Sequence, residues 1–394
     1  MSRFAATLGL LLQNTGFGNR FVKHKIIPGN PGNFSVIFEA EDSNNIGHRV
    51  FIKAFNLFES DPYRKLSFYR EAELLKKVRG KKRCLWSVED SVSLAKIKTA
   101  SAVGNIEQDV PYIATEHCPD GVNDFFYLIR TRPLWERLKI FKDIVLSIEA
   151  MHSCNISHRD IKPDNFRIAI HDGEKVVVAI DYGTAHEDGQ EHIYKNYADY
   201  GAPGELYYSS PELISGLAHF QNFGKAADIY ALGIVLEKLM YSQSNYTERA
   251  IQFIQICNQI KNRLINVPQS NQIDFFKDAW SNVIDSTQLF PSNIPALDAQ
   301  KNEHCLLEGI NRIHSMMINP NFEKRLKEFS EIHKRLDTLI LAAQRSTLYA
   351  RIALLSDQKR IAHDKISDRD FKYKKRVESR KILSQKHNKP KELS

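Results

Sequence analysis

Hydrophobic and polar positions divide the chain into an early part with strand patterns and a later part with helix patterns. Between residues 26 and 55, apolar and β-branched runs alternate with Gly, Asn and Pro turns, which predicts two or three strands. Residues 66–78 (LSFYREAELLKKV) follow, and their apolar positions recur at helical spacing. Helical periodicity then dominates residues 229–355. The pattern therefore places strands early in the chain and helices late in it.

The middle of the chain combines a helix pattern with a hairpin pattern. Residues 134–154 have apolar positions at helical spacing and predict a helix whose role is packing. Residues 168–180 (IAIHDGEKVVVAI) predict a β-hairpin, because Asp172-Gly173 between two apolar runs is a strong turn signal. Such a hairpin brings the residues at its two ends close together.

The remaining segments give shorter or more ambiguous patterns. An apolar run at residues 5–12 predicts a helix packed on the domain, whereas residues 84–110 allow strands and loops equally. The polar stretch at 266–300 indicates either a docking insertion or a long surface loop, and we favour the loop. The last helix pattern runs from residue 326 to about residue 341.

Composition narrows the class of protein. The 394 residues are 42% hydrophobic and 26% charged, as in soluble globular proteins. The five cysteines are odd in number and have no CxxC spacing, which favours reduced thiols and a cytoplasmic location. No stretch approaches the roughly eighteen apolar residues of a membrane span, and the run at 5–12 lacks the features of a signal peptide.

Positive charge gathers at the end of the chain. Residues 357–394 contain thirteen Lys or Arg and six Asp or Glu, which accounts for +7 of the net charge of +8. A basic arm of this kind can bind anionic lipid or another anionic partner, but a solvated, partly disordered tail is the more common outcome. Only Phe371 and Tyr373 are aromatic here, so we infer no specific nucleic-acid binding.

The residues with the clearest chemistry lie just before the predicted hairpin and just after it. Residues 157–168 read SHRDIKPDNFRI, and residues 179–183 read AIDYG. Phosphoryl transfer needs a carboxylate to orient the hydroxyl, a cation for the developing charge, and oxygen ligands for Mg²⁺. A plain surface turn is the alternative, but eight consecutive compatible residues make coincidence improbable. The candidates for these roles, in order, are Asp160, Lys162, and Asn165 with Asp181.

These two segments resemble the HRDxKxxN catalytic loop and the DFG motif of eukaryotic-type protein kinases, with Tyr182 in place of Phe. The later text GELYYSSPE resembles the motif that closes the activation segment, and Arg325 is placed like the arginine that pairs with its Glu212. Asp228 matches the buried aspartate that supports the catalytic loop. Small-molecule kinases lack the closing motif, so the resemblance favours the protein-kinase branch.

The resemblance also implies a nucleotide site. VFIK at 50–53 is similar to the VAIK strand, which makes Lys53 the residue that holds the α- and β-phosphates, paired with Glu71 or, as the alternative, Glu73. The turn before it matches the Gly-rich loop imperfectly, with Asn30 at its first glycine position. Thr115 is placed as the gatekeeper. The other residues implied to bind the nucleotide are Gly32, Asn33, Ser35, Ile37, Glu116 and Cys118.

Three departures from the family pattern put its properties in question. Phe51 stands where the family usually has an alanine against the adenine ring, so the nucleotide pocket is expected to be reshaped. Glu205 stands where Ser/Thr kinases usually have a threonine. Residues 185–204 contain no Ser or Thr, so we expect an acidic residue of this segment to pair with Arg159 and make threonine phosphorylation unnecessary: Glu187, Asp188, Glu191 or Asp199.

The resemblance implies an α+β, bilobal protein-kinase-like fold, with a small antiparallel sheet lobe joined to a mainly helical lobe. The expected parts are an extension at 1–25, an N-lobe and hinge at 26–118, a C-lobe at 119–345 with an insertion near 266–300, and a basic tail at 346–394. KPDNF and the hairpin are most similar to the casein kinase one group, although the SPE ending departs from it.

The implied function is an ATP- and Mg²⁺-dependent protein kinase that phosphorylates Ser and Thr, because Lys162 two residues after Asp160 is the family's choice for those hydroxyls. Phe51, Asn30 and Glu205 keep a nucleotide-binding pseudokinase or scaffold as the alternative. A small-molecule or lipid kinase is a third reading. By analogy, divergent kinase motifs also occur in effectors that intracellular bacteria secrete, which would place the protein in a host-cell cytosol.

Overall fold

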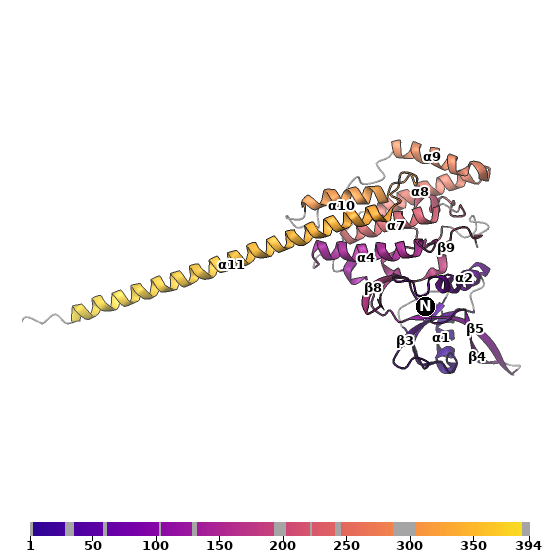
Figure 1. The fold of residues 1–394 in the computed structure, drawn as a ribbon, viewed down its shortest axis with the longest axis horizontal. Coiled ribbons are helices and arrows are strands. Elements are labelled where there is room, and N and C mark those ends of the chain that lie inside the picture. The colour runs from indigo at the N-terminus through magenta and orange to yellow at the C-terminus, as the bar shows by residue number, and fades with distance from the viewer. Residues whose placement is uncertain are drawn as a thin grey trace, which may run out of the picture.

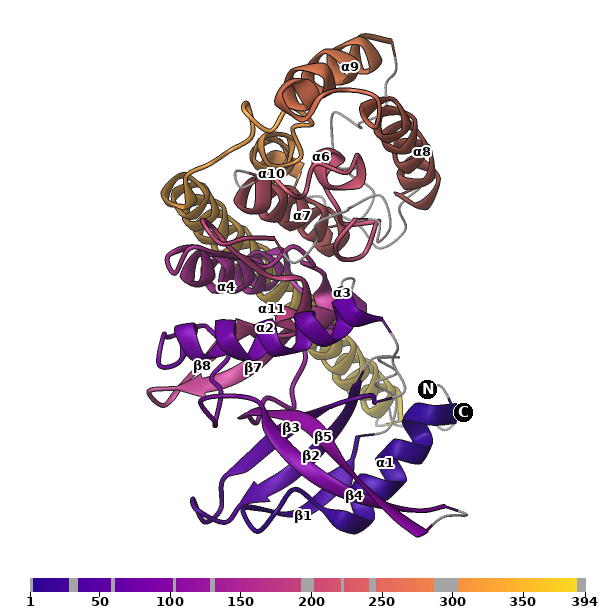
Figure 2. The same cartoon turned by 90° about the vertical axis from the view of Figure 1, so that its right-hand side faces the viewer.

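The computed structural model describes residues 3–27, 35–57, 61–101, 104–127, 132–192, 202–220, 223–240, 246–286 and 304–387. Figure 1 and Figure 2 show a lobe built around a sheet and a lobe built from helices, with one helix that projects far from both. The predicted bilobal α+β fold is confirmed. No helix among the described residues is long and apolar enough to cross a membrane.

The N-lobe is a five-stranded antiparallel sheet in the order β1-β2-β3-β5-β4. Its strands alternate buried and exposed positions, so that Phe38 and Ile52 face a core under the sheet. Helix α1 (Arg3–Thr15) closes this core with Leu8 and Leu12, as the apolar run at 5–12 predicted. The strands are β1 (Phe21–Ile26), β2 (Ser35–Asp42), β3 (Arg49–Phe55), β4 (Ser93–Ser101) and β5 (Gly104–Glu116).

Helix α2 (Pro62–Val78) lies between the sheet and the C-lobe (Figure 2). It begins where the sequence provides a start signal, because the carboxylate of Asp61 accepts a hydrogen bond from the Tyr63 N–H and Pro62 takes the first helical position. Its buried side includes Glu71 as well as Leu74 and Leu75. A buried carboxylate on this face requires a partner, which the site provides.

The C-lobe forms around helix α7 (Phe223–Met240), which is buried along nearly its whole length. Gly233 permits this packing, because a Cβ there would lie 2.6 Å from a side-chain carbon of Ile318. The helices around it are α3 (Asp124–Tyr127), α4 (Leu134–His152), α6 (Pro211–Ile214), α8 (Tyr246–Leu264), α9 (Gln272–Ser286) and α10 (His304–Met317).

Two short ladders carry the catalytic segments. The hairpin of β7 (Phe166–His171) and β8 (Glu174–Ala179) turns at Asp172 and Gly173, which both have positive φ, as a type I′ turn requires. The predicted hairpin is therefore confirmed. Strand β6 (Ile156–Ser157) pairs with β9 (His186–Glu187), which brings the chain back beside the catalytic loop.

Two expectations about the helical part are wrong. The stretch at 266–300, interpreted as a surface loop, contains α9, whose Phe276 and Trp280 are buried in the C-lobe core. Its residues from 287 onward lie outside the described residues. The sequence separates these aromatic side chains by a helical interval of four, but the surrounding polar residues conceal that pattern.

The last helix also differs from expectation. Helix α11 runs from Phe329 to His387, a single element of 59 residues, so it neither ends near residue 341 nor gives way to a disordered tail within the described residues. The boundary expected at 345/346 falls inside it, two residues beyond Ala343, its last described buried side chain. The first part of α11 packs on α4 and α10 through Ile332 and Leu336, and the rest projects away from the molecule (Figure 1).

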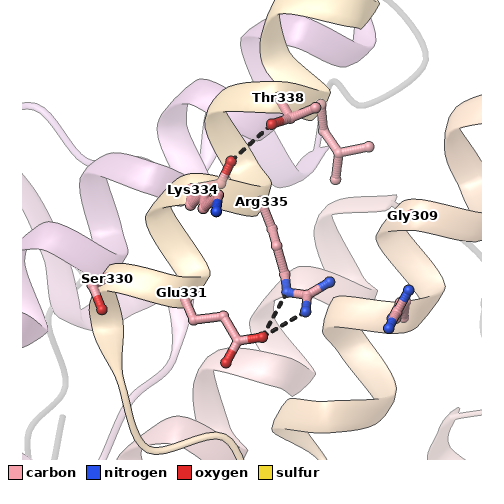
Figure 3. A pocket seen from close by; sticks show the side chains of 8 residues that line it. Gly309, Ser330, Glu331, Lys334, Arg335 and Thr338 are labelled. Carbon is pink, nitrogen blue, oxygen red and sulfur yellow. Dashed lines mark hydrogen bonds and ion pairs between the residues drawn. The ribbon is translucent and has the colours of Figure 1, made fainter.

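A cavity of about 730 Å³ lies between α10 and the first turns of α11 (Figure 3). Within it, Arg335 donates hydrogen bonds from Nη2 and Nε to the same carboxylate oxygen of Glu331, at 2.5 and 3.1 Å. Its lining residues come from these two helices alone, so it is separate from the catalytic segments.

Candidate active site

A half-buried lysine of the sheet contacts carboxylates from α2 and from the segment after β8. Lys53 lies on β3 directly opposite Ile37 of β2. Its Nζ lies 2.7 Å from Oε2 of Glu71 and 2.8 Å from Oδ1 of Asp181. The structure thus brings together the lysine, the α2 glutamate and the second carboxylate that the sequence singled out. Glu73, the alternative partner, is exposed on α2.

The charges of these three residues depend on one another. The ammonium of Lys53 holds the pKa of Asp181 at about 2, well below its usual value. Burial alone would lower the pKa of Lys53, but the neighbouring carboxylates of Asp181 and Glu71 outweigh it and raise that pKa. Burial raises the pKa of Glu71, and Lys53 only partly opposes this effect. Asp181 therefore stays ionised at neutral pH and can bind a cation.

The catalytic loop holds Asp160 in a fixed orientation. The amide nitrogen of Asn165 donates to the backbone oxygen of Asp160 at 2.7 Å and to its Oδ2 at 2.9 Å. The Nζ of Lys162 lies 3.1 Å from the same Oδ2. Because Asn165 uses its nitrogen in this way, its amide oxygen is left for another partner. Asp160, Lys162 and Asn165 thus converge as the sequence pattern predicted.

Asp228 of α7 supports this loop from below. Its carboxylate is fully buried and accepts hydrogen bonds from the backbone N–H groups of His158 and Arg159, at 2.7 and 2.8 Å. His152 lies 2.8 Å from the same carboxylate. The loop backbone, including Arg159 with a φ of 67°, is therefore tied to the central helix of the C-lobe. The predicted role of Asp228 in supporting the loop is confirmed.

Asn165 and Asp181 suit a divalent cation. Asp181 lies at the end of the β7–β8 hairpin with a φ of 63°, a conformation in which its carboxylate faces Lys53. A Cβ at Gly183 would lie 3.3 Å from Oδ1 of Asp181, so the glycine keeps space open beside that oxygen. An amide oxygen and an ionised carboxylate are ligands that Mg²⁺ prefers. Asn165 and Asp181 therefore fit Mg²⁺.

The end of the activation segment is fixed by a second pair of distant residues. Arg325 donates to both carboxylate oxygens of Glu212, at 2.6 and 3.1 Å, and both side chains are fully buried. This bidentate pair joins residues 113 positions apart in sequence. The pairing predicted for Glu212 is confirmed.

The chain matches the family model described as the protein kinase domain over residues 29–340. It belongs to the protein kinase family. Among curated relatives, this kinase is 34% identical over 145 residues to the serine/threonine-protein kinase ksp1 of Schizosaccharomyces pombe, an alignment that covers 34% of this chain and 29% of that protein. No finding supports the closer resemblance to the casein kinase one group or to bacterial effectors.

Two other relatives give a similar picture. Calcium-dependent protein kinase 27 of Arabidopsis thaliana is 26% identical over 179 residues, 44% of this chain and 33% of that protein. Calcium/calmodulin-dependent protein kinase kinase cmkC of Emericella nidulans is 35% identical over 145 residues, 37% of this chain and 26% of that protein. The alignments thus span about a quarter to a third of these relatives.

The nucleotide side of the kinase cleft is only partly described. Gly32 and Asn33 lie outside the described residues, as does Asn30. Ser35 is buried on β2, and Ile37 faces the cleft opposite Lys53. Phe51 lies two residues before Lys53 and therefore on the same face of β3, where its ring centroid is 4.6 Å from that of His117. The rings of Phe51 and His117 thus occupy the side of the cleft where the resemblance places the adenine base.

The hinge residues use their side chains away from the cleft. The carboxylate of Glu116 accepts a hydrogen bond from the Trp86 N–H at 2.8 Å and lies 3.0 Å from Nε2 of His171. Cys118 is buried, and its thiol belongs to the C-lobe core. Any contact of Glu116 or Cys118 with a nucleotide must therefore come from the backbone.

This hinge contact is a feature that the sequence analysis missed. His171, fully buried at the end of β7, accepts a hydrogen bond at Nδ1 from the Arg83 N–H at 3.1 Å. Nε2 of His171 therefore carries the ring hydrogen and donates a hydrogen bond to the Glu116 carboxylate. The Trp86 ring stacks on the imidazole at 4.0 Å. The only sequence signal was a histidine inside an apolar hairpin strand, whose partners are distant along the chain.

Beside the catalytic loop, the activation segment forms a cluster of basic and imidazole groups. The rings of His186 and His192 stack at a centroid distance of 3.7 Å. Burial lowers the pKa of His186 to about 3 and that of His192 to about 4, with help from the positive charges of Arg159 and Arg70. Both imidazoles are therefore neutral at pH 7.

Two of the acidic residues expected to pair with Arg159 form ion pairs with lysines instead. Glu187 forms an ion pair with Lys77, and Asp188 lies 3.2 Å from Nζ of Lys225. The backbone oxygen of Glu191 accepts a hydrogen bond from Arg70, and the pairing of the Glu191 carboxylate with Arg159 stays a prediction. Asp199 lies outside the described residues, as do Tyr194, Tyr197 and Tyr200.

Proposed function

We propose that this kinase transfers the γ-phosphoryl group of ATP to Ser and Thr hydroxyls of protein substrates, with Mg²⁺ as cofactor. The observation that carries the proposal is the convergence of Lys53, Glu71 and Asp181 on one side of the cleft with Asp160, Lys162 and Asn165 on the other. Lys53 and Asp181 have the charge states that phosphoryl transfer requires, because their mutual attraction keeps both ionised at neutral pH.

In this proposal, Asp160 accepts the proton of the substrate hydroxyl while Asn165 holds its carboxylate in place. Lys162 offsets negative charge on the transferred group, and Lys53, oriented by Glu71, binds the α- and β-phosphates. When bound between Asn165 and Asp181, Mg²⁺ supplies charge neutralisation for the phosphates. The contribution of the chain is mostly positioning and electrostatics.

Support for Ser and Thr as acceptors comes from Lys162, two residues beyond Asp160, and from relatives whose names include serine/threonine-protein kinase. A protein substrate is in keeping with the buried Glu212–Arg325 pair that closes the activation segment. We also propose that the basic C-terminal helix binds an anionic partner, because most of the net charge of the chain lies there.

Transfer of labelled phosphate from ATP tests the function. We expect label on Ser or Thr of a generic acceptor protein, and a loss of at least about a thousandfold in kcat for Asp160→Ala and Asp181→Ala. Glu73→Ala, on the exposed side of α2, is the matched control and should keep its activity. Full activity in both aspartate variants would contradict the assignment, and label on a small molecule or lipid without label on protein would change the substrate class.

A scaffold that binds nucleotide without transfer is the second candidate, and Phe51 against His117 is the observation that favours it. If ATP raises the melting temperature of the wild-type chain but no label appears on any acceptor, the scaffold reading replaces the enzyme reading.

A further inference from the structure

The projecting part of α11 has an exposed apolar line along it. Leu341, Leu348 and Leu355 are 56%, 57% and 49% exposed and follow one another at intervals of seven residues, so they lie on one side of the helix. Tyr373, 69% exposed, comes eighteen residues after Leu355, which is five full turns of 3.6 residues. The line therefore extends over more than thirty residues of helix with no described side chain of the chain covering it.

Basic side chains lie on the same side of this helix. Lys359 is one turn beyond Leu355, and Arg369 and Arg376 flank Tyr373 at the helical spacings of four and three. The sequence between 356 and 376 contains eight Lys or Arg and four Asp, and seven of the basic side chains are described as exposed: Lys359, Lys365, Arg369, Lys372, Lys374, Lys375 and Arg376. Apolar and basic groups thus share one face.

The combination of apolar and basic side chains indicates which kind of partner covers this face. A second copy of the helix packed in parallel and in register would bring Lys359, Arg369 and Arg376 against the same basic residues, and like charges in a helix seam destabilise it. Nucleic acid would satisfy the charges but give the leucines no apolar contact. An anionic membrane surface satisfies both, because leucines enter the acyl boundary while Lys and Arg reach the phosphate groups.

We propose that the exposed face of α11, marked by Leu341, Leu348, Leu355 and Tyr373 with Lys359, Arg369 and Arg376, binds an anionic lipid surface. The helix lies along the interface, since it is too polar to cross a bilayer. This binding does not depend on phosphoryl transfer, because all of the face except Leu341 lies beyond Ala343, the last described buried side chain of α11.

Co-sedimentation of the full chain with vesicles tests the proposal. We expect binding to phosphatidylcholine vesicles that contain about 30% phosphatidylserine and little binding to phosphatidylcholine alone. Because each basic residue near an anionic leaflet contributes roughly fivefold, Arg369→Gln/Lys372→Gln/Arg376→Gln should weaken binding about a hundredfold. Leu348→Gln/Leu355→Gln should weaken it about tenfold or more. Glutamine keeps helix propensity in both sets.

Matched variants elsewhere on the surface serve as controls. Lys23→Gln/Lys25→Gln/Lys98→Gln removes the same charge from exposed N-lobe strands, and Leu66→Gln/Leu94→Gln removes two leucines that are each 56% exposed. Both should bind vesicles like wild type. Kinase activity and helix content by circular dichroism should be unchanged in the α11 variants.

Three results would overturn the proposal. One is equal binding to anionic and zwitterionic vesicles. Another is a loss of binding in the charge variant without any loss in the leucine variant, which would indicate a polyanion such as nucleic acid. The third is a leucine variant that converts a dimer into a monomer in light scattering while it still binds vesicles, which would assign the face to a second copy.

Discussion

Glu205 is the residue whose charge is least expected beside the catalytic groups. Its backbone N–H donates to Oδ1 of Asp160 at 2.8 Å, and its carboxylate lies 3.6 Å from Nζ of Lys162. Gly204 before it has a φ of 79°, and a Cβ there would meet Asp160, so the chain approaches the catalytic aspartate closely. Lys162 therefore divides its positive charge between two carboxylates.

We predict that Glu205→Thr raises kcat about threefold to tenfold, because Lys162 then faces the transferred phosphoryl group without a competing carboxylate; the gain is modest since an exposed carboxylate is screened by solvent. Initial rates at several salt concentrations provide the measurement, and the gain should shrink at high salt. Glu205→Gln, which keeps the size of the side chain, should show the same gain. A fall in kcat for both variants would instead mean that the carboxylate helps bind the substrate.

At this scale the sequence was informative where the motif was local. Asp160, Lys162 and Asn165 lie within six positions, so their convergence followed from the loop itself. The choice of Glu71 over Glu73 depended on the face of α2, which the spacing of Leu74 and Leu75 indicated. The side-chain direction of Glu116 could not be predicted, because it depends on a histidine 55 residues away.

At the scale of an element, the start of the activation segment holds two neutral imidazoles against two guanidinium groups. The folded pKa values of about 3 for His186 and about 4 for His192 are below the usual value of 6.5. Between pH 6.5 and about 4, the unfolded chain therefore binds protons that the folded chain does not. Stability must fall as the pH drops through this window.

We predict that the melting temperature of wild type falls as pH is lowered from 6.5 to 4, and that His192→Phe makes this fall shallower. Phenylalanine preserves a ring that can stack on His186 but cannot bind a proton. Thermal unfolding in buffers of equal ionic strength measures the effect. His48→Phe, on the exposed turn before β3, is the control, and an identical slope in both variants would show that the histidine pair does not cause the loss.

Helices α9 and α11 show where sequence patterns fail for whole elements. In α9 seven of the fifteen residues are apolar, but the longer stretch around them is polar, and only packing on α8 reveals that Phe276 and Trp280 form a buried side. Beyond residue 343 none of the described side chains of α11 is buried, so the composition of the tail was consistent with disorder. Hairpin β7–β8 was predictable because its turn residues specify it locally.

At the scale of the whole molecule, the contacts among His171, Glu116 and Trp86 join the hinge to the C-lobe. Burial raises the pKa of Glu116, and the Trp86 N–H and His171 only partly oppose this effect. The neighbouring Arg83 is itself fixed to the C-lobe, because its backbone oxygen accepts from Ser147 and its guanidinium lies 3.0 Å from Asp143. These contacts therefore fix Arg83 and Trp86 beside Glu116.

We predict that His171→Ala lowers the free energy of unfolding by about 2–4 kcal/mol, because it leaves the buried Arg83 N–H without a partner and leaves the Glu116 carboxylate with only the hydrogen bond from Trp86. The KM for ATP should rise as well, since the hinge is less fixed. Urea unfolding and steady-state kinetics measure the two effects. Unchanged stability, with His48→Ala as the exposed control, would contradict a structural role for the contacts of His171.

The ring of Phe51 has a consequence for selective inhibition of this kinase. Compounds that compete with ATP by lying under β3 are shaped for the small alanine that the family usually has there, and they would collide with the Phe51 ring. A flat, narrow compound that packs on the Phe51 ring would gain an aromatic contact that a kinase with alanine cannot supply. Phe51 therefore provides a basis for inhibitors that are selective for this kinase.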